Sequence, residues 1–129
     1  MSSELKNTAA VHEPDPTLER SRESHPHIAD MVRDDALLLL GSARIARDIE
    51  DRKRAGVAKY GTPLQGYNGR NPVMDLYQEL LDAANYMRQH MWEEVDAGRY
   101  GYDHKEWLTK YQALLDLIKF VQADLPSKY

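Results

Sequence analysis

The chain has 129 residues, of which 42% are hydrophobic and 29% charged, with no cysteine and a formal net charge of −4. This composition predicts one soluble domain and excludes a disulfide framework, a thiolate zinc site and a cysteine nucleophile. The longest apolar run, 36–40, is far too short to span a membrane, and an acidic chain is poorly suited to bind duplex nucleic acid. We therefore expect a cytoplasmic protein with neither membrane nor duplex nucleic acid as a partner.

The first 25 residues differ from the rest of the chain. They carry few apolar side chains, two prolines and eight charges. Such a segment cannot bury enough surface to offset the entropy of ordering it. We expect a disordered tail over 1–25 and a helical domain over 26–129.

A long helix is predicted over residues 27–59, because apolar side chains recur there at steps of three and four. Gly41 and Gly56 lie inside this stretch, where a kink or a break is possible, and Gly61 is a typical residue to end it. Leucines at 37–40 place apolar side chains on all sides of the helix. A three-helix monomer would leave some of them in water, so we expect a homo-oligomer.

Two further helices follow a loop at 61–71 that holds three glycines, a proline and an Asn-Gly pair. Asn71 and Pro72 form a cap and first turn, and one apolar face then runs to Val95 before Gly98. Asp103 and Glu106 have the spacing of a capping box, and a third helix runs from there toward Pro126. No segment is typical of a strand, so the sequence predicts an all-α, three-helix bundle.

Two pairs of carboxylates lie three residues apart: Asp48 with Asp51, and Glu79 with Asp82. Each pair shares a helix face, and antiparallel packing across the loop would bring the pairs together. Four converging carboxylates need a cation, and oxygen ligands suit Mg²⁺ or Mn²⁺. The alternative is a solvated acidic face opposite the apolar stripe of the second helix, made of Asp75, Glu79, Asp82 and Glu93.

Basic and aromatic side chains gather around the same loop. The cations are Arg52, Lys53, Arg54, Lys59 and Arg70, and the loop adds Tyr60, Gln65, Tyr67 and Asn68. Cations hold phosphates, a tyrosine face stacks on a base, and an amide reads the edge of a base. The alternative is a basic helix end that complements the helix dipole, followed by a structural turn.

These segments resemble a family. The stretches Asp48–Arg52, Lys59–Gln65, Asn68–Arg70 and Asp75–Gln89 are similar to small phage and prophage proteins described as MazG-like, and the resemblance covers about 45–92. It is looser to the true MazG-type nucleotide pyrophosphohydrolases. Those are all-α enzymes that work as dimers or tetramers. They bind Mg²⁺ through a Glu-x-x-Glu and a Glu-x-x-Asp pair and convert nucleoside triphosphates to monophosphate and pyrophosphate.

The resemblance implies metal ligands at Asp48, Asp51, Glu79 and Asp82, with Glu79 and Asp82 also catalytic, in a homodimer or homotetramer. Glu79 and Asp82 match the second pair of the family in both residue types. Asp48 and Asp51 stand where the family has glutamates, and their shorter reach can lose a metal ligand while leaving nucleotide binding intact.

Three functions follow as hypotheses. The first is Mg²⁺-dependent hydrolysis of nucleoside triphosphates, with Lys59 and Arg70 neutralising the phosphates. The second is a non-catalytic binder that sequesters a nucleotide immune signal, in the host cytoplasm if a phage encodes the chain. Its ligand would be held by Tyr60, Gln65, Tyr67, Asn68, Arg70 and Asn85. The third is a helical adaptor without a ligand.

Overall fold

The computed structural model describes residues 25–126, so all of the expected tail except His25 lies outside the described residues. Four helices are present in this range: α2 (Ile28–Leu40), α3 (Ala43–Tyr60), α4 (Pro72–Ala97) and α5 (His104–Gln122). Between residues 25 and 126 there is no β-strand, which confirms the all-α prediction. None of these helices is long and apolar enough to cross a membrane.

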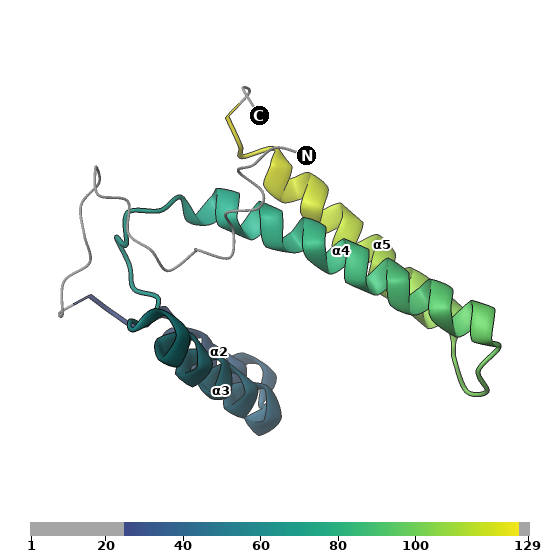
Figure 1. Cartoon of the computed structure of the whole chain (residues 1–129), viewed down its shortest axis with the longest axis horizontal. Coiled ribbons are helices and arrows are strands. Elements are labelled where there is room, and N and C mark those ends of the chain that lie inside the picture. The colour runs from purple at the N-terminus through teal and green to yellow at the C-terminus, as the bar shows by residue number, and fades with distance from the viewer. Residues whose placement is uncertain (1–24, 127–129) are drawn as a thin grey trace. The chain divides into compact units, whose positions relative to one another are not determined.

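The described chain forms two compact units, one within 25–70 and the other within 71–126. The first unit is a hairpin of α2 and α3, and the second is a hairpin of α4 and α5 (Figure 1). The predicted count of three helices is therefore wrong, because the expected helix over 27–59 is two helices.

The break lies at Gly41 and Ser42. Gly41 has a φ of 62°, in the left-handed region, and its N–H donates to the carbonyl of Leu37 at 3.1 Å. The N–H of Ser42 donates to the carbonyl of Ala36, and the Ser42 hydroxyl accepts from the N–H of Ile45. A C-terminal glycine cap and an N-cap serine thus stand side by side and end one helix as the next begins.

The α2–α3 hairpin is held by small residues and by ion pairs. Ala36 and Ala46 are its buried apolar residues. Arg33 Nη1 lies 3.0 Å from Glu50 Oε2, and Lys53 Nζ lies 2.8 Å from Asp30 Oδ1. Asp30 precedes Arg33 on α2, whereas its partner Lys53 follows Glu50 on α3, so the two helices run antiparallel.

The α4–α5 hairpin follows its predicted signals. The Asn71 side chain accepts from two N–H groups of the first turn of α4, and Gly98 ends the helix with a φ of 60°. Asp103 accepts from the N–H of Glu106, as the capping box predicts. Between the helices, the His90 and Trp107 rings lie 4.5 Å apart, centroid to centroid.

One expectation for α4 is wrong. Asp75, assigned to a solvated acidic face, is buried together with Met74 and Gln78. Glu79, Asp82 and Glu93 are exposed, as that face predicts. A helical wheel treats all turns of a helix alike, whereas here Met74, Asp75 and Gln78 are buried in the first turns while Val73 and Leu76 beside them are exposed. The helix dipole favours a carboxylate at this N-terminal position.

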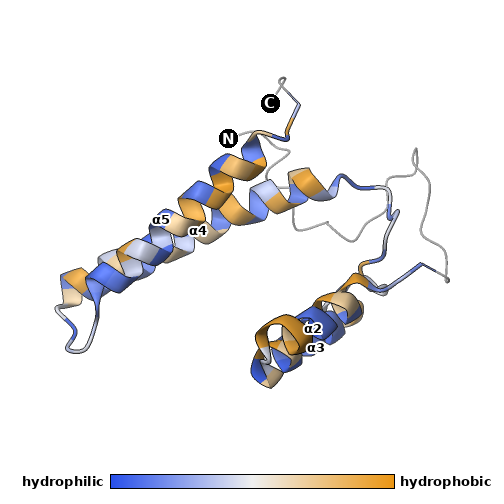
Figure 2. Cartoon of the chain, turned by 180° about the vertical axis from the view of Figure 1, so that it is seen from behind, coloured by the Kyte–Doolittle hydropathy of each residue, from blue (hydrophilic) through white to orange (hydrophobic). Residues whose placement is uncertain are grey.

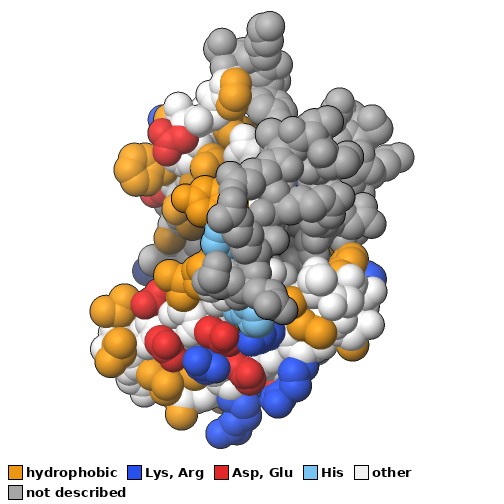
Figure 3. Space-filling model, turned by 90° about the vertical axis from the view of Figure 1, so that its left-hand side faces the viewer, with side chains coloured by type: hydrophobic (Ala, Val, Ile, Leu, Met, Phe, Trp, Pro, Cys, Tyr) orange, Lys and Arg blue, Asp and Glu red, His pale blue; other side chains and the backbone are white. Residues whose placement is uncertain are grey.

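The end of α2 exposes its leucines. The exposed fractions of Leu38, Leu39 and Leu40 are 82%, 79% and 67%. Figure 2 shows hydrophobic residues concentrated at this end of the hairpin. Figure 3 shows hydrophobic side chains on the surface beside acidic and basic ones. A two-helix hairpin buries only one stripe of each helix, so these leucines lack cover within their own unit.

Candidate functional site

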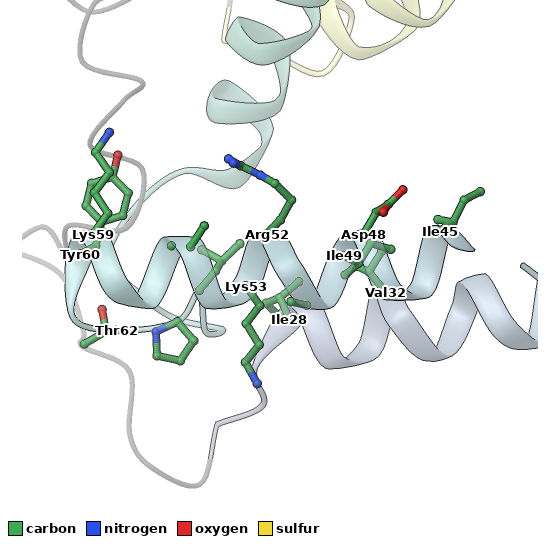
Figure 4. A pocket seen from close by; sticks show the side chains of 15 residues that line it. Ile28, Val32, Ile45, Asp48, Ile49, Arg52, Lys53, Lys59, Tyr60 and Thr62 are labelled. Carbon is green, nitrogen blue, oxygen red and sulfur yellow. The ribbon is translucent and has the colours of Figure 1, made fainter. Parts of the chain in front are cut away.

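A groove of about 590 Å³ lies within the α2–α3 unit. The first turns of α2, one face of α3 and the loop 62–64 enclose it. Its apolar walls include Ile28, Val32, Ile45, Ile49, Pro63 and Leu64, and its polar side chains are Asp48, Arg52, Lys53, Lys59, Tyr60 and Thr62. It therefore combines an apolar interior with a polar and mostly cationic edge (Figure 4).

Backbone pairing folds the loop over the start of α2. Gly61 ends α3 with a φ of 83°, and the chain then turns back. The N–H of Ile28 donates to the carbonyl of Leu64 at 2.9 Å, and a single antiparallel bridge joins His27 to Gln65. This pairing closes one end of the groove with Pro63 and Leu64.

Neighbouring cations on α3 differ in their partners. Lys53 is paired with Asp30, Arg44 with Asp48 at 3.3 Å, and Arg54 with Asp51 at 2.8 Å. Among residues 25–126, neither Arg52 nor Lys59 has a carboxylate partner. Lys59 Nζ lies over the Tyr60 ring, 5.2 Å from its centroid. Figure 4 shows Arg52 and Lys53 pointing away from each other.

The ion pairs shift pKa values in the expected directions. The hydrogen bond from Lys53 lowers the pKa of Asp30. Hydrogen bonds to Glu50 and Asp34 raise the pKa of Arg33, and the bond to Asp51 raises that of Arg54. The ion pairs thus favour the ionised forms of Asp30, Arg33 and Arg54.

The polar loop residues predicted to bind a nucleotide have structural contacts. Gln65 Nε2 donates to the carbonyl of His25 at 3.1 Å, and Asn68 Oδ1 accepts from the N–H of Arg70 at 3.1 Å. Tyr67 has a φ of 58° and is 72% exposed, with its ring 5.2 Å from that of His25. Lys59 and Tyr60 line the groove, whereas Gln65, Tyr67, Asn68 and Arg70 do not.

The two carboxylate pairs lie in different units. Asp48 and Asp51 are exposed on α3, and Glu79 and Asp82 are exposed on α4, with Asn85 one turn further on. Within either unit, no three His, Asp or Glu side chains of the described range form a group that could hold a metal ion. The convergence of the four carboxylates stays a prediction.

Sequence reasoning placed Arg52 in a basic cluster but did not find the groove. Its apolar walls come from α2 and the loop as well as from α3, and the break at Gly41 creates that packing. A signal was present, because Asp48, Arg52 and Lys59 are four and seven residues apart and so share one face of a helix.

Comparison of the chain with protein-family models, with curated proteins and with solved structures finds no match.

The Asp30–Lys53 pair predicts an acid-sensitive fold. Because the folded-state pKa of Asp30 is lowered, its carboxylate contributes stability above its unfolded pKa, and that contribution is lost as the pH falls below about 4. Asp30→Asn should lower the melting temperature at pH 7, and the difference from the wild type should shrink toward pH 3. Melts followed by circular dichroism across this range measure it.

The matched control is Asp34→Asn, which removes a more exposed carboxylate from the same helix. Its melting temperature should differ less from the wild type at pH 7. A constant difference between Asp30→Asn and the wild type from pH 7 to pH 3 would contradict the assigned role of Asp30.

Proposed function

We propose that this chain binds a nucleotide in the α2–α3 groove. The observation that supports this proposal is that Arg52 and Lys59 line the groove and lack a carboxylate partner among the described residues. Arg33, Arg44, Lys53 and Arg54 of the same hairpin are all ion-paired. A phosphate is the counter-charge that such cations hold through charged hydrogen bonds.

The groove also suits the apolar part of a nucleotide. Its walls offer Val32, Ile49 and Pro63, and the Tyr60 ring lies at the end of α3. A base is flat and largely apolar on its two faces, so aliphatic and aromatic side chains cover it well. The volume of about 590 Å³ lies within the range of small-molecule sites.

The first test is Arg52→Ala. Removing a charged hydrogen bond to phosphate should weaken nucleotide binding roughly tenfold or more. Isothermal titration calorimetry with AMP and ATP measures the change.

Arg47→Ala is the matched control. Arg47 is exposed on α3 and lies outside the groove lining, so its loss changes the net charge equally and should leave affinity within about twofold. Equal losses in the two variants would show a general effect of charge and would contradict the groove as the site.

A second candidate function is Mg²⁺- or Mn²⁺-dependent hydrolysis of a nucleoside triphosphate to monophosphate and pyrophosphate. The observation that favours it is Asp48, which lines the same groove one turn from Arg52. A carboxylate next to bound phosphate is suited to share a metal ion with it. Asp51, Glu79 and Asp82 would be the other ligands, with Glu79 and Asp82 positioning the attacking water.

Glu79→Gln tests this candidate. If the carboxylate holds the metal, the variant should lose both the stabilisation of the wild type by Mg²⁺ and the release of pyrophosphate, and should melt at the same or a slightly higher temperature without metal. Glu93→Gln, an exposed change on the same helix, is the control.

A wild type with no Mg²⁺-dependent shift in melting temperature and no pyrophosphate release from common triphosphates would rule out the hydrolase. Nucleotide binding without turnover would then support the non-catalytic binder that sequesters a nucleotide signal.

We also propose that the chain is a homodimer or homotetramer, in which copies complete a MazG-like bundle by covering the exposed leucines of α2. Burying apolar side chains contributes about 25 cal/mol per Å². Light scattering should give a mass that is a multiple of 14.9 kDa, and Leu39→Ser should shift it toward one chain.

Phe120→Ser, an equally exposed position on α5, should leave the mass unchanged. A single-chain mass for the wild type at micromolar concentration would contradict the oligomer.

A further inference from the structure

We infer that Gly56 keeps open the position of a phosphate group in the α2–α3 groove, where one phosphate contacts both Arg52 and Lys59. This inference rests on the proposed nucleotide binding and specifies where the anionic group of the nucleotide lies.

The backbone of α3 does not require a glycine at position 56. Gly56 lies inside the helix and is not one of the glycines with a positive φ, so residues with a side chain can adopt its conformation. A glycine in a helix interior also weakens the helix relative to alanine. The missing side chain therefore points to a need for space at this position.

That space opens into the groove. Gly56 lines the groove and is partly exposed. It lies four residues after Arg52 and three before Lys59, so the three positions share one face of α3. Figure 4 shows the Arg52 and Lys59 side chains on the same side of the helix. Gly56 thus leaves a gap between two cations that lack a carboxylate partner among residues 25–126.

The other groove-lining residues of α3 between these cations are Lys53 and Ala55. Lys53 Nζ lies 2.8 Å from Asp30 Oδ1, so its charge is already compensated, and it points away from Arg52 (Figure 4). Ala55 has no polar side-chain atom. Arg52 and Lys59 are therefore the donors on this part of α3 that an anion can bind without breaking an ion pair.

The two cations are close enough to share one phosphate. Seven residues separate them, which is about 10 Å along the helix axis. A phosphate beside Gly56 would lie about 6 Å from Arg52 and about 5 Å from Lys59 along that axis, and long, flexible side chains can span these distances. A phosphate has several acceptor oxygens, so it can accept from a guanidinium and an ammonium group at once.

Substitutions of Gly56 test the inference through two measurements on the full chain. Gly56→Ala should raise the melting temperature by a few degrees, because alanine favours the helix, and should weaken AMP binding severalfold. Gly56→Leu, which fills the gap with a good helix former, should weaken AMP binding tenfold or more. Circular dichroism gives the melting temperatures, and calorimetry gives the affinities.

Ala58→Leu is the matched control. Ala58 is exposed on α3 and lies outside the groove lining, so a larger side chain there should leave AMP affinity within about twofold.

AMP also tests whether both cations contact the same anion, because it carries one phosphate. Arg52→Ala and Lys59→Ala should each weaken AMP binding roughly tenfold. Lys105→Ala, an exposed change on α5, is the charge-matched control for Lys59 and should leave the affinity unchanged.

The outcomes distinguish this inference from the proposed function. A Gly56→Ala variant that melts below the wild type would show that the glycine is needed for the packing of α3. That result, wild-type AMP affinity in Gly56→Leu, or a loss of AMP affinity in Arg52→Ala but not in Lys59→Ala would each overturn the inference and leave nucleotide binding standing. Failure of both AMP and ATP to bind the wild type would overturn both proposals.

Discussion

The left-handed conformation of Gly41 is the constraint on which the described part of the N-terminal unit depends. It ends α2 at Leu40 and lets Ser42 cap α3 directly, so the chain reverses within two residues. The reversal sets Asp30 and Arg33 opposite Lys53 and Glu50. In one continuous helix these side chains would lie far apart along the helix axis. Neither the ion pairs between α2 and α3 nor the groove could then form.

The elements that depend on local chemistry were predictable from the sequence. Asn71 and Asp103 act through groups within three residues of themselves, and α4 and α5 begin where these caps place them. The break at Gly41 was not predictable as a certainty, because the apolar spacing continues through it. An interior glycine costs a helix only about 1 kcal/mol, and packing between α2 and α3 decides whether the helix continues.

The candidate site, like the fold, could be predicted only in part from the sequence. The sequence located the cations near the loop, but it could not say which of them an acid neutralises. Arg52 and Lys53 are adjacent, yet only Lys53 faces Asp30 of the other helix. This distinction depends on a contact between residues 23 apart. The burial of Asp75 was missed for a related reason, because a pattern within one helix does not report what covers it.

The pairing of the acids affects how a metal could take part. Asp48 and Asp51 each have an arginine of their own helix within ion-pair distance, so a cation would have to displace Arg44 and Arg54. Exposed pairs of this kind contribute less than about 1 kcal/mol each, so their loss is a small cost. The larger obstacle to metal binding is the small number of oxygen ligands in the groove.

Magnesium takes about six oxygen ligands, and the groove lining supplies one carboxylate, that of Asp48. The phosphates of a bound nucleotide would supply several of the missing oxygens and reduce the repulsion among the acids. Anion binding at Arg52 and Lys59 requires no described ion pair to break. In this hairpin, metal binding would therefore follow nucleotide binding, and the affinity for Mg²⁺ would depend on the number and position of the phosphates already held.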